Sequence, residues 1–296
     1  MKSGFISILG KPNVGKSTLL NQLVGSKVAA VSKKPQTTRQ VIRGILTEPR
    51  GQIIFLDTPG FHKPKDQLGK FMVRAAANTF HEADLFYWMV EPFSSGDSGA
   101  TFLEELRAEK ERQGSSKPVF CIINKVDCIS KPELLPVIDH CQKIFPFDEI
   151  FPISALTGDQ VDLLLEETFK HLPEHEPYFP PDIASDQTER FLASEMIREK
   201  IFRFTGEEIP YASAVQIDEF KEEEPIIRIE ATVFTEKESQ KGILIGAKGQ
   251  KMKEIGQAAR IEVEDFFDKK VFLKLWVKTL KNWKKDEESL KRLGFQ

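Results

Sequence analysis

The chain has 296 residues, of which 40% are hydrophobic, enough for two domains of about 150 residues with ordinary cores. A formal net charge of −3 excludes a globally basic protein, so any binding of nucleic acid must rest on a local patch. The three cysteines lack a C-x-x-C spacing and no apolar run approaches a membrane span. We therefore expect a cytoplasmic protein without a disulfide framework, zinc site, signal peptide or transmembrane helix.

A phosphate-binding loop is predicted near the N-terminus. Residues 10–17 read G-K-P-N-V-G-K-S, follow the apolar run 5–9 and precede apolar residues at helical spacing. Here the glycines let backbone N–H groups point inward and the helix N-terminus adds positive charge, so we expect a polyphosphate. Lys16 is expected to reach the β and γ phosphates, and the Ser17 hydroxyl to bind Mg²⁺. The residues expected around the nucleotide are Gly10, Lys11, Pro12, Asn13, Val14, Gly15, Lys16, Ser17 and Thr18.

Short apolar runs and longer amphipathic segments alternate through the first 172 residues. This order predicts an α/β domain whose mostly parallel sheet is covered by helices on both faces. In such a sheet the ligand lies beyond the carboxyl ends of the strands, which is where each motif falls. The expected strands are residues 5–9, 53–56, 85–90, 119–123 and 150–153.

Two further motifs are placed to complete the phosphate and metal site. One of Thr37 and Thr38 is expected to join the Mg²⁺ shell when a γ phosphate is present, and we assign Thr38. Asp57 directly follows a strand and is expected to hold Mg²⁺ through a water, while the Gly60 N–H contacts the γ phosphate. A plain turn is the alternative for this stretch. The segment is Asp57, Thr58, Pro59, Gly60 and Phe61, and the residues expected to act in hydrolysis are Lys16, Thr38, Asp57 and Gly60.

A guanine-binding motif follows the apolar run 119–123. Guanine presents two donors on one edge, N1–H and the 2-amino group, which the Asp127 carboxylate can accept together. Adenine lacks both donors, and each lost bond costs about 1 to 3 kcal/mol, so the motif predicts GTP rather than ATP. Asn124 and Lys125 are expected to brace the base and the phosphate loop, and the Ala155 N–H to donate to guanine O6. The residues expected at the base are Asn124, Lys125, Val126, Asp127, Ser154 and Ala155.

Four ordered motifs at four strand ends resemble the small GTPase domain family. The loop K-P-N-V and the segment D-T-P-G-F are similar to those of translation-factor-related bacterial GTPases. In these proteins an apolar residue, here Phe61, replaces the water-orienting glutamine of Ras-like proteins, so we expect slow intrinsic hydrolysis. A core position away from the nucleotide is the equal alternative for Phe61. The resemblance also makes Asn13 a candidate to help bind K⁺ near the β–γ bridge.

A second domain is predicted after a proline-rich connector. Four prolines between residues 173 and 181 favour an extended, semi-rigid linker. We therefore predict a first domain at 1–172, a linker at 173–184 and a second domain at 185–296. The elements predicted in the second domain are a helix at 186–204, strands at 211–220 and 226–235, a helix, G-x-x-G loop and helix at 241–255, a strand at 271–277 and a last amphipathic helix from 283.

The order of these elements resembles a type II KH domain, an α+β fold that binds RNA. Its two glycines let the G-x-x-G loop approach a single-stranded backbone closely. Five basic residues against one acidic residue between 241 and 260 form the local patch that the net charge hides, so we favour RNA over a protein partner. Trp276, between Lys274 and Lys278, is either a base-stacking residue or, more commonly, packed on a helix. The residues expected at RNA are Lys241, Gly246, Ala247, Lys248, Gly249 and Lys251.

A GTPase domain followed by a KH domain, with Q-T-T-R at 36–39, resembles the Era family over nearly the whole chain. The resemblance implies a protein without a stable oligomer that binds GTP/GDP and Mg²⁺ and hydrolyses GTP. It also implies binding to the 3′ end of small-subunit (16S) ribosomal RNA and a role in small ribosomal subunit assembly. Alternatives are a GTPase held on the inner face of the cell membrane by its last helix, and an RNA-binding scaffold with a structural nucleotide. We expect the γ phosphate to order the segments around Thr38 and Gly60 and so to change how the RNA-binding face is presented.

Overall fold

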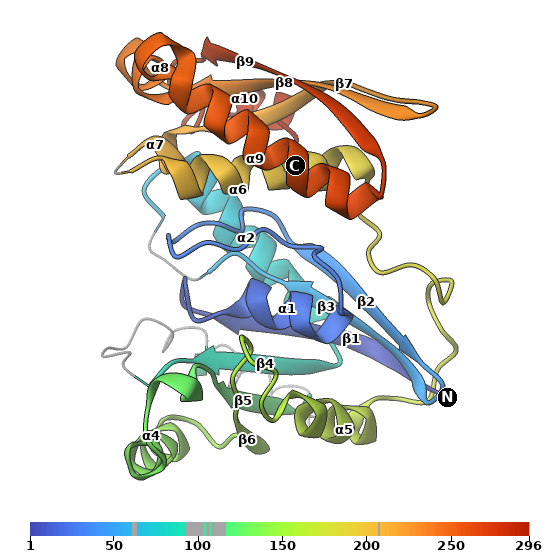
Figure 1. The fold of residues 1–296 in the computed structure, drawn as a ribbon. Helices are drawn as coiled ribbons and strands as arrows, with labels where there is room; N and C mark the ends of the chain where they lie inside the picture. The colour runs from blue at the N-terminus through green and yellow to red at the C-terminus, as the bar shows by residue number, and fades with distance from the viewer. Residues whose placement is uncertain (61–63, 93–102, 105–106, 108–116, 207, 296) are drawn as a thin grey trace. The chain divides into compact units, whose positions relative to one another are not determined.

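The computed structural model describes residues 1–60, 64–92, 103–104, 107, 117–206 and 208–295 of the chain (Figure 1). They form two compact units, each with its own sheet. Two short segments of the N-terminal half belong to the second unit, and the predicted domain boundaries at 172 and 184 stay predictions. Unit 1 comprises Met1–Ala29, Thr38–Lys63 and Met72–Asp186, and unit 2 comprises Ala30–Thr37, Pro64–Phe71 and Gln187–Gln296.

Unit 1 is built on a six-stranded sheet with the strand order β2-β3-β1-β4-β5-β6. All neighbouring strands are parallel except β2 and β3, which are antiparallel. Every residue of β3 and β5 is buried, so both faces of the sheet are covered, and the predicted mostly parallel α/β fold is confirmed. The strands are β1 (Lys2–Gly10), β2 (Ile42–Glu48), β3 (Gly51–Asp57), β4 (Leu85–Val90), β5 (Val119–Ile123) and β6 (Glu149–Pro152).

The helices that connect these strands begin at local sequence signals. The first begins directly after Gly15, and the helix at 131–144 begins with a capping box between Ser130 and Glu133. Apolar side chains of the strands, such as Phe86 and Trp88, pack with Phe145 beyond the end of that helix. The helices are α1 (Lys16–Val24), α2 (Gln67–Glu82), the 3₁₀ turn η1 (Val126–Cys128), α4 (Lys131–Ile144) and α5 (Val161–His171).

The parallel register brings the carboxyl ends of the strands to one edge of the sheet. Ile8 of β1 lies opposite Asp57, the last residue of β3. Ile123, the last residue of β5, lies opposite Pro152, the last residue of β6. The phosphate loop, the D-T-P-G segment, the N-K-V-D motif and the S-A-L motif each follow one of these strands. The sheet therefore gathers all four motifs at one edge.

Unit 2 is built on a three-stranded sheet with the order β7-β8-β9, in which β7 and β8 are antiparallel and β8 and β9 parallel. Helices α6 and α9 share an apolar core with this sheet, including Ile197, Val233 and Ala259. The predicted KH-like order of elements is confirmed. The elements are α6 (Glu189–Phe204), α7 (Ile209–Ala212), β7 (Ala214–Glu223), β8 (Ile226–Thr235), α8 (Glu238–Ile245), η2 (Ala247–Gly249), α9 (Gln250–Phe267), β9 (Lys270–Thr279) and α10 (Glu287–Arg292).

Two sequence predictions for unit 2 are wrong in detail. The strand predicted at 211–220 begins at 214, because Pro210 suits the first turn of a helix and Tyr211 lies in the short α7. The last helix begins at Glu287 rather than at 283, since the Asp286 side chain caps it. Trp283 is instead fully buried, and its indole N–H donates to a backbone carbonyl of α7.

Candidate functional site

The phosphate loop joins β1 to α1 in a conformation that only glycine accepts at two positions. Gly10 and Gly15 have φ values of 148° and 102°, both in the left-handed region. A Cβ atom at Gly10 would lie 2.4 Å from the Met89 carbonyl oxygen, and one at Gly15 would lie 2.2 Å from the Asn124 amide nitrogen. The loop is therefore fitted closely against the ends of β4 and β5, with no room for side chains at these glycines.

Lys16 is buried inside this loop. Its ammonium group donates to the carbonyl oxygens of Gly10 at 3.3 Å and Lys11 at 3.0 Å. Burial lowers the pKa of Lys16 to about 8, although the Asp57 carboxylate acts in the opposite direction. Because the nearby groups do not fully replace the water that the Lys16 ammonium loses on burial, this site is suited to bind an anion. A bound anion would raise the pKa of Lys16 again.

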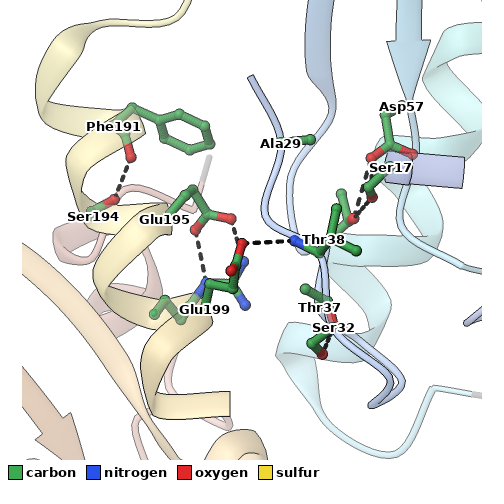
Figure 2. A network of polar contacts seen from close by, with 12 residues as sticks. Ser17, Ala29, Ser32, Thr37, Thr38, Asp57, Phe191, Ser194, Glu195 and Glu199 are labelled. Carbon is green, nitrogen blue, oxygen red and sulfur yellow. Dashed lines mark hydrogen bonds and ion pairs between the residues drawn. The ribbon is translucent and has the colours of Figure 1, made fainter. Parts of the chain in front are cut away.

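Three oxygen-bearing side chains meet beside Lys16, and their arrangement fits Mg²⁺ (Figure 2). The Ser17 hydroxyl lies 2.8 Å from the Thr38 hydroxyl and 2.6 Å from Asp57 Oδ2, and Thr38 donates to the same oxygen at 3.3 Å. Among the described residues, the other carboxylate oxygen, Asp57 Oδ1, is buried without a hydrogen-bond partner. Hydroxyl and carboxylate oxygens are the ligands that Mg²⁺ prefers, so this set fits the predicted ion.

The same geometry distinguishes the two adjacent threonines. Thr37 turns away from Asp57, and its hydroxyl bonds to Ser32 at 2.6 Å and to the Lys34 carbonyl oxygen at 2.7 Å (Figure 2). Thr38 alone of the pair contacts Ser17 and Asp57. This supports the assignment of Thr38 to the metal, which stays a prediction.

Magnesium binding is expected to weaken as the pH falls through 6. Burial raises the pKa of Asp57 to about 6, which outweighs the opposing effect of Lys16. Mg²⁺ requires the ionised carboxylate, so protonation competes with the metal below this pKa. Titration of the protein with Mg²⁺ and GDP should show about a tenfold lower affinity for Mg²⁺ at pH 5 than at pH 7. An Asp57→Asn variant should bind Mg²⁺ weakly at both pH values. If the Mg²⁺ affinity of the variant changed with pH as much as that of wild type, protonation of Asp57 would not be the cause.

The segment after β3 lies against the phosphate loop. The Thr58 hydroxyl donates to the Ile8 carbonyl oxygen at 2.7 Å, and a Cβ atom at Gly60 would lie 2.6 Å from the Pro12 nitrogen. Gly60 is therefore packed against the phosphate loop with no room for a side chain, and its contact with the γ phosphate stays a prediction. Phe61 lies outside the described residues.

Asn124 links the guanine motif to the phosphate loop. Its amide donates to the Val14 carbonyl oxygen at 2.7 Å, and its amide oxygen accepts from the Ala155 N–H at 2.8 Å. One buried side chain thus joins the loops that follow β1, β5 and β6. The Ala155 N–H, which we predicted to donate to guanine O6, has Asn124 as its partner in this structure.

Asp127 presents the carboxylate expected to recognise the base. It is the second residue of the turn η1. This turn begins directly after Lys125, which has a left-handed backbone conformation with a φ of 67°. A hydrogen bond from Ser154 is the main factor that lowers the pKa of Asp127. Asp127 is therefore fully ionised at neutral pH and can accept two hydrogen bonds from one guanine edge.

Sequence reasoning missed Glu91, which forms an ion pair with Lys125. Glu91 directly follows β4, so the rule that functional side chains follow parallel strands could have found it. What the sequence could not show is that β4 and β5 are neighbours, which is why the two charges meet. The pair fixes the direction of the Lys125 side chain beside the predicted base site.

Replacement of Glu91 is expected to weaken guanine binding without abolishing it. In Glu91→Gln, Lys125 loses a charged partner that is about one quarter exposed, so we expect a two- to tenfold weaker affinity for GDP. Calorimetry with GDP measures the effect. Glu48→Gln, which removes a similarly exposed ion pair with Arg50, is the matched control and should not change the affinity. Equal affinities of Glu91→Gln and wild type would refute the positioning role.

The predicted RNA-binding loop lies in unit 2 between α8 and α9. Gly246 and Gly249 have φ values of 73° and 78°, and Lys248 between them is also left-handed at 50°. A Cβ atom at Gly246 would lie 2.6 Å from Lys251 Cβ, whereas nothing lies within 4 Å of one at Gly249. The Gly246 backbone is thus packed against α9, while the space beside Gly249 is open to a partner.

Comparison with known proteins gives the same division of the chain. Residues 5–125 match the family described as 50S ribosome-binding GTPase, and residues 208–284 match the KH domain family. GTPase Era of Syntrophus aciditrophicus is 49% identical over 99% of this chain and 95% of its own length. GTPase Era of Ruminiclostridium cellulolyticum is 46% identical over 100% of this chain and 98% of its own length.

The chain belongs to the GTPase Era family. It is accordingly a GTP-hydrolysing enzyme with a GTPase domain followed by a KH domain.

Solved structures of Era support this assignment. Aquifex aeolicus Era bound to GDP and AlF₄⁻ matches with a TM-score of 0.92 and 40% identity, over 100% of this chain and 99% of the other. Era in complex with MgGDPNP and nucleotides 1506–1542 of 16S ribosomal RNA matches with a TM-score of 0.92 and 41% identity over the same shares. Within the described residues of this Era family member, no helix is long and apolar enough to cross a membrane.

Proposed function

We propose that this protein is a Mg²⁺-dependent GTPase that binds the 3′ end of 16S ribosomal RNA and assists assembly of the small ribosomal subunit. The observation that carries the proposal is the presence in one chain of an ionised carboxylate at Asp127, after β5, and of an open G-x-x-G loop at Gly249. The solved Era complex with MgGDPNP and 16S ribosomal RNA supports the same pair of ligands.

The loop has the chemistry that a single-stranded backbone requires. Lys248 is exposed at the tip of the loop, where its ammonium group can pair with a phosphate. Gly249 leaves room for the backbone to approach, and Ile243 on α8 exposes 58% of its surface beside the loop, where a base can pack. Charge, space and apolar surface therefore occur together at this end of unit 2.

The decisive experiment measures phosphate release from GTP with and without an RNA that spans nucleotides 1506–1542 of 16S ribosomal RNA. We expect the RNA to change the rate of release and to bind less tightly as salt rises. Gly249→Asp should abolish both effects while leaving basal hydrolysis unchanged, because Asp tolerates the left-handed conformation and meets no neighbour. Intact RNA binding in this variant would favour a protein-binding module instead. An RNA that binds without any effect of nucleotide would favour a scaffold.

We further propose that residues 30–37 couple the two activities. Within unit 2 this segment is held on α6, because the Val31 N–H donates to Glu199 at 3.0 Å and Lys34 donates to carbonyl oxygens at the C-terminal end of α6. Thr38, the next residue along the chain, belongs to unit 1 and contacts Asp57. Ordering of Thr38 by a γ phosphate would thus act on α6 through the short segment from Thr38 back to Lys34, in which the Thr37 hydroxyl donates to the Lys34 carbonyl oxygen. RNA affinity that is equal with GDP and with a GTP analogue would refute this coupling.

Three finer expectations belong to the same proposal. Asn13, whose φ of 66° places it in the left-handed part of the phosphate loop, would help bind K⁺, so hydrolysis should be faster in K⁺ than in Na⁺. The protein would act without a stable oligomer. A peripheral membrane contact through the tail is disfavoured, because its apolar side chains Trp283, Leu290 and Phe295 are buried.

A further inference from the structure

The side chain of Asn21, on α1, holds the chain at the point where it leaves unit 1. Its amide oxygen accepts from the N–H groups of Val28 at 3.0 Å and Ala29 at 2.9 Å, and its amide nitrogen donates to the Ala29 carbonyl oxygen at 2.9 Å. Ala29 is the last residue of unit 1 before the segment 30–37. All three bonds are to the backbone, so Asn21 fixes the course of the chain itself.

The turn after α1 is built to bring the chain back to Asn21. The helix ends at Val24, because Gly25 has a left-handed φ of 72° and its N–H donates to the Asn21 carbonyl oxygen at 3.0 Å. Three residues later, Val28 and Ala29 are each only 2% exposed. Both the backbone and the side chain of Asn21 therefore take part in this reversal of the chain.

The two ends of the segment 30–37 are held by side chains on one face of α1. Ser17 and Asn21 are four residues apart in this helix, so their Cβ atoms lie about 5 to 6 Å apart. Asn21 holds Ala29, before the segment, and the Ser17 hydroxyl lies 2.8 Å from that of Thr38, after it. The segment thus leaves unit 1 and returns to it within one helical turn, as the ends of an Ω-loop do.

The two ends differ in their relation to the nucleotide. Thr38 is held by Ser17 and Asp57, which are the groups expected to bind Mg²⁺, so its contacts should change with the bound nucleotide. The three bonds of Asn21 involve none of the groups expected at the nucleotide. A loop with one end permanently fixed keeps its other end within a small volume, which raises the local concentration of Thr38 beside Ser17.

We propose that Asn21 is a positioning residue for GTP hydrolysis, which fixes the start of the segment 30–37 so that Thr38 reaches Mg²⁺ when the γ phosphate is present. This inference rests on the proposed role of Thr38 at the metal and adds a residue that acts through it. GDP has no γ phosphate and does not require Thr38. Asn21 therefore acts on the hydrolysis of GTP and not on the binding of GDP.

The experiment measures kcat for GTP and the affinity for GDP in full-length variants. Asn21→Leu, which replaces the amide with an apolar group of similar size, should lower kcat about tenfold and leave the affinity for GDP within twofold of wild type. Asn21→Asp keeps an oxygen for the two N–H groups and should recover part of this loss. Gln52→Leu is the matched control, because the Gln52 amide forms the same three kinds of bond with the backbone of residues 178 and 179. It should leave kcat within about twofold of wild type.

A double-mutant cycle with Thr38→Ala distinguishes positioning from a general structural role. If Asn21 acts through Thr38, Asn21→Leu should lower kcat less than about twofold in the Thr38→Ala background. A loss that is equal in both backgrounds would overturn the inference. Normal hydrolysis by Asn21→Leu, with a large loss in Thr38→Ala, would overturn this inference alone. Normal hydrolysis by Thr38→Ala would refute the proposed role of Thr38 at the metal, and this inference with it.

Amide hydrogen exchange tests the fixed end in the wild-type protein, where the stability of a variant does not matter. The N–H groups of Val28 and Ala29 should exchange slowly and at the same rate with GDP and with a GTP analogue. The N–H of Thr38 should exchange more slowly with the analogue. A response to the nucleotide at residues 28 and 29 as large as that at Thr38 would show that Asn21 does not fix the start of the segment.

Discussion

The Asp127→Asn variant is expected to lose GTP and gain xanthosine triphosphate. A carboxylate can accept from both N1–H and the 2-amino group of guanine, whereas an amide accepts from only one of them and presents a donor to the other. The lost hydrogen bond, and the two donors left facing each other without an acceptor, each cost about 1 to 3 kcal/mol, which predicts at least an approximately 30-fold weaker affinity for GTP. Xanthine carries a carbonyl oxygen in place of the 2-amino group, so the amide pairs with it and affinity should return.

Competition between labelled GDP and each unlabelled triphosphate measures this change. Asp139→Asn, which removes an exposed carboxylate from α4, is the matched control and should keep the preference of wild type. The fold should be unaffected, since Asp127 is exposed and its side chain is bonded to Ser154 and Cys128 rather than packed in the core. A variant that binds GTP as tightly as wild type, or that ignores xanthosine triphosphate, would remove Asp127 from base recognition.

The sequence predicts the parts of the site that follow strands, because strand ends can be recognised from apolar runs. Asp57 and Asn124 each follow a run that the structure confirms as a buried parallel strand. In the same way, the order of elements from α6 to β9 is visible in the alternation of helical and extended patterns. These features depend on residues close together in the chain, which is why spacing reveals them.

Contacts that depend on strand order are not visible in the sequence. Glu91 and Lys125 meet because β4 and β5 are neighbours, and Asn124 reaches both Val14 and Ala155 because β1, β5 and β6 end at one edge. The burial of Trp283 likewise depends on a distant carbonyl group. Spacing along the chain does not determine which strands become neighbours in the sheet, so it does not predict which of these residues contact each other.

Replacement of Lys16 by methionine is expected to destroy activity and to raise stability. We expect the buried ammonium group to bind a phosphate, so its loss should lower the rate of GTP hydrolysis by about a thousandfold or more. Without nucleotide, however, the folded protein must keep this charge out of water, which is why the pKa of Lys16 falls to about 8. Methionine has a similar shape and no charge, so it removes that cost.

The pH dependence of this gain in stability follows from the direction of the shift. Between pH 8 and 10.5 the unfolded chain binds more protons at Lys16 than the folded chain, so wild type gains stability as the pH rises. The advantage of Lys16→Met should therefore be largest below pH 8, on the order of 3 kcal/mol, and should fade by pH 10.5. Urea unfolding of nucleotide-free protein at pH 7 and pH 10 measures it, with Lys143→Met on the surface of α4 as the control. If Lys16→Met has a lower free energy of unfolding than wild type at pH 7, Lys16 stabilises the nucleotide-free loop, and the predicted cost of burying its charge is refuted.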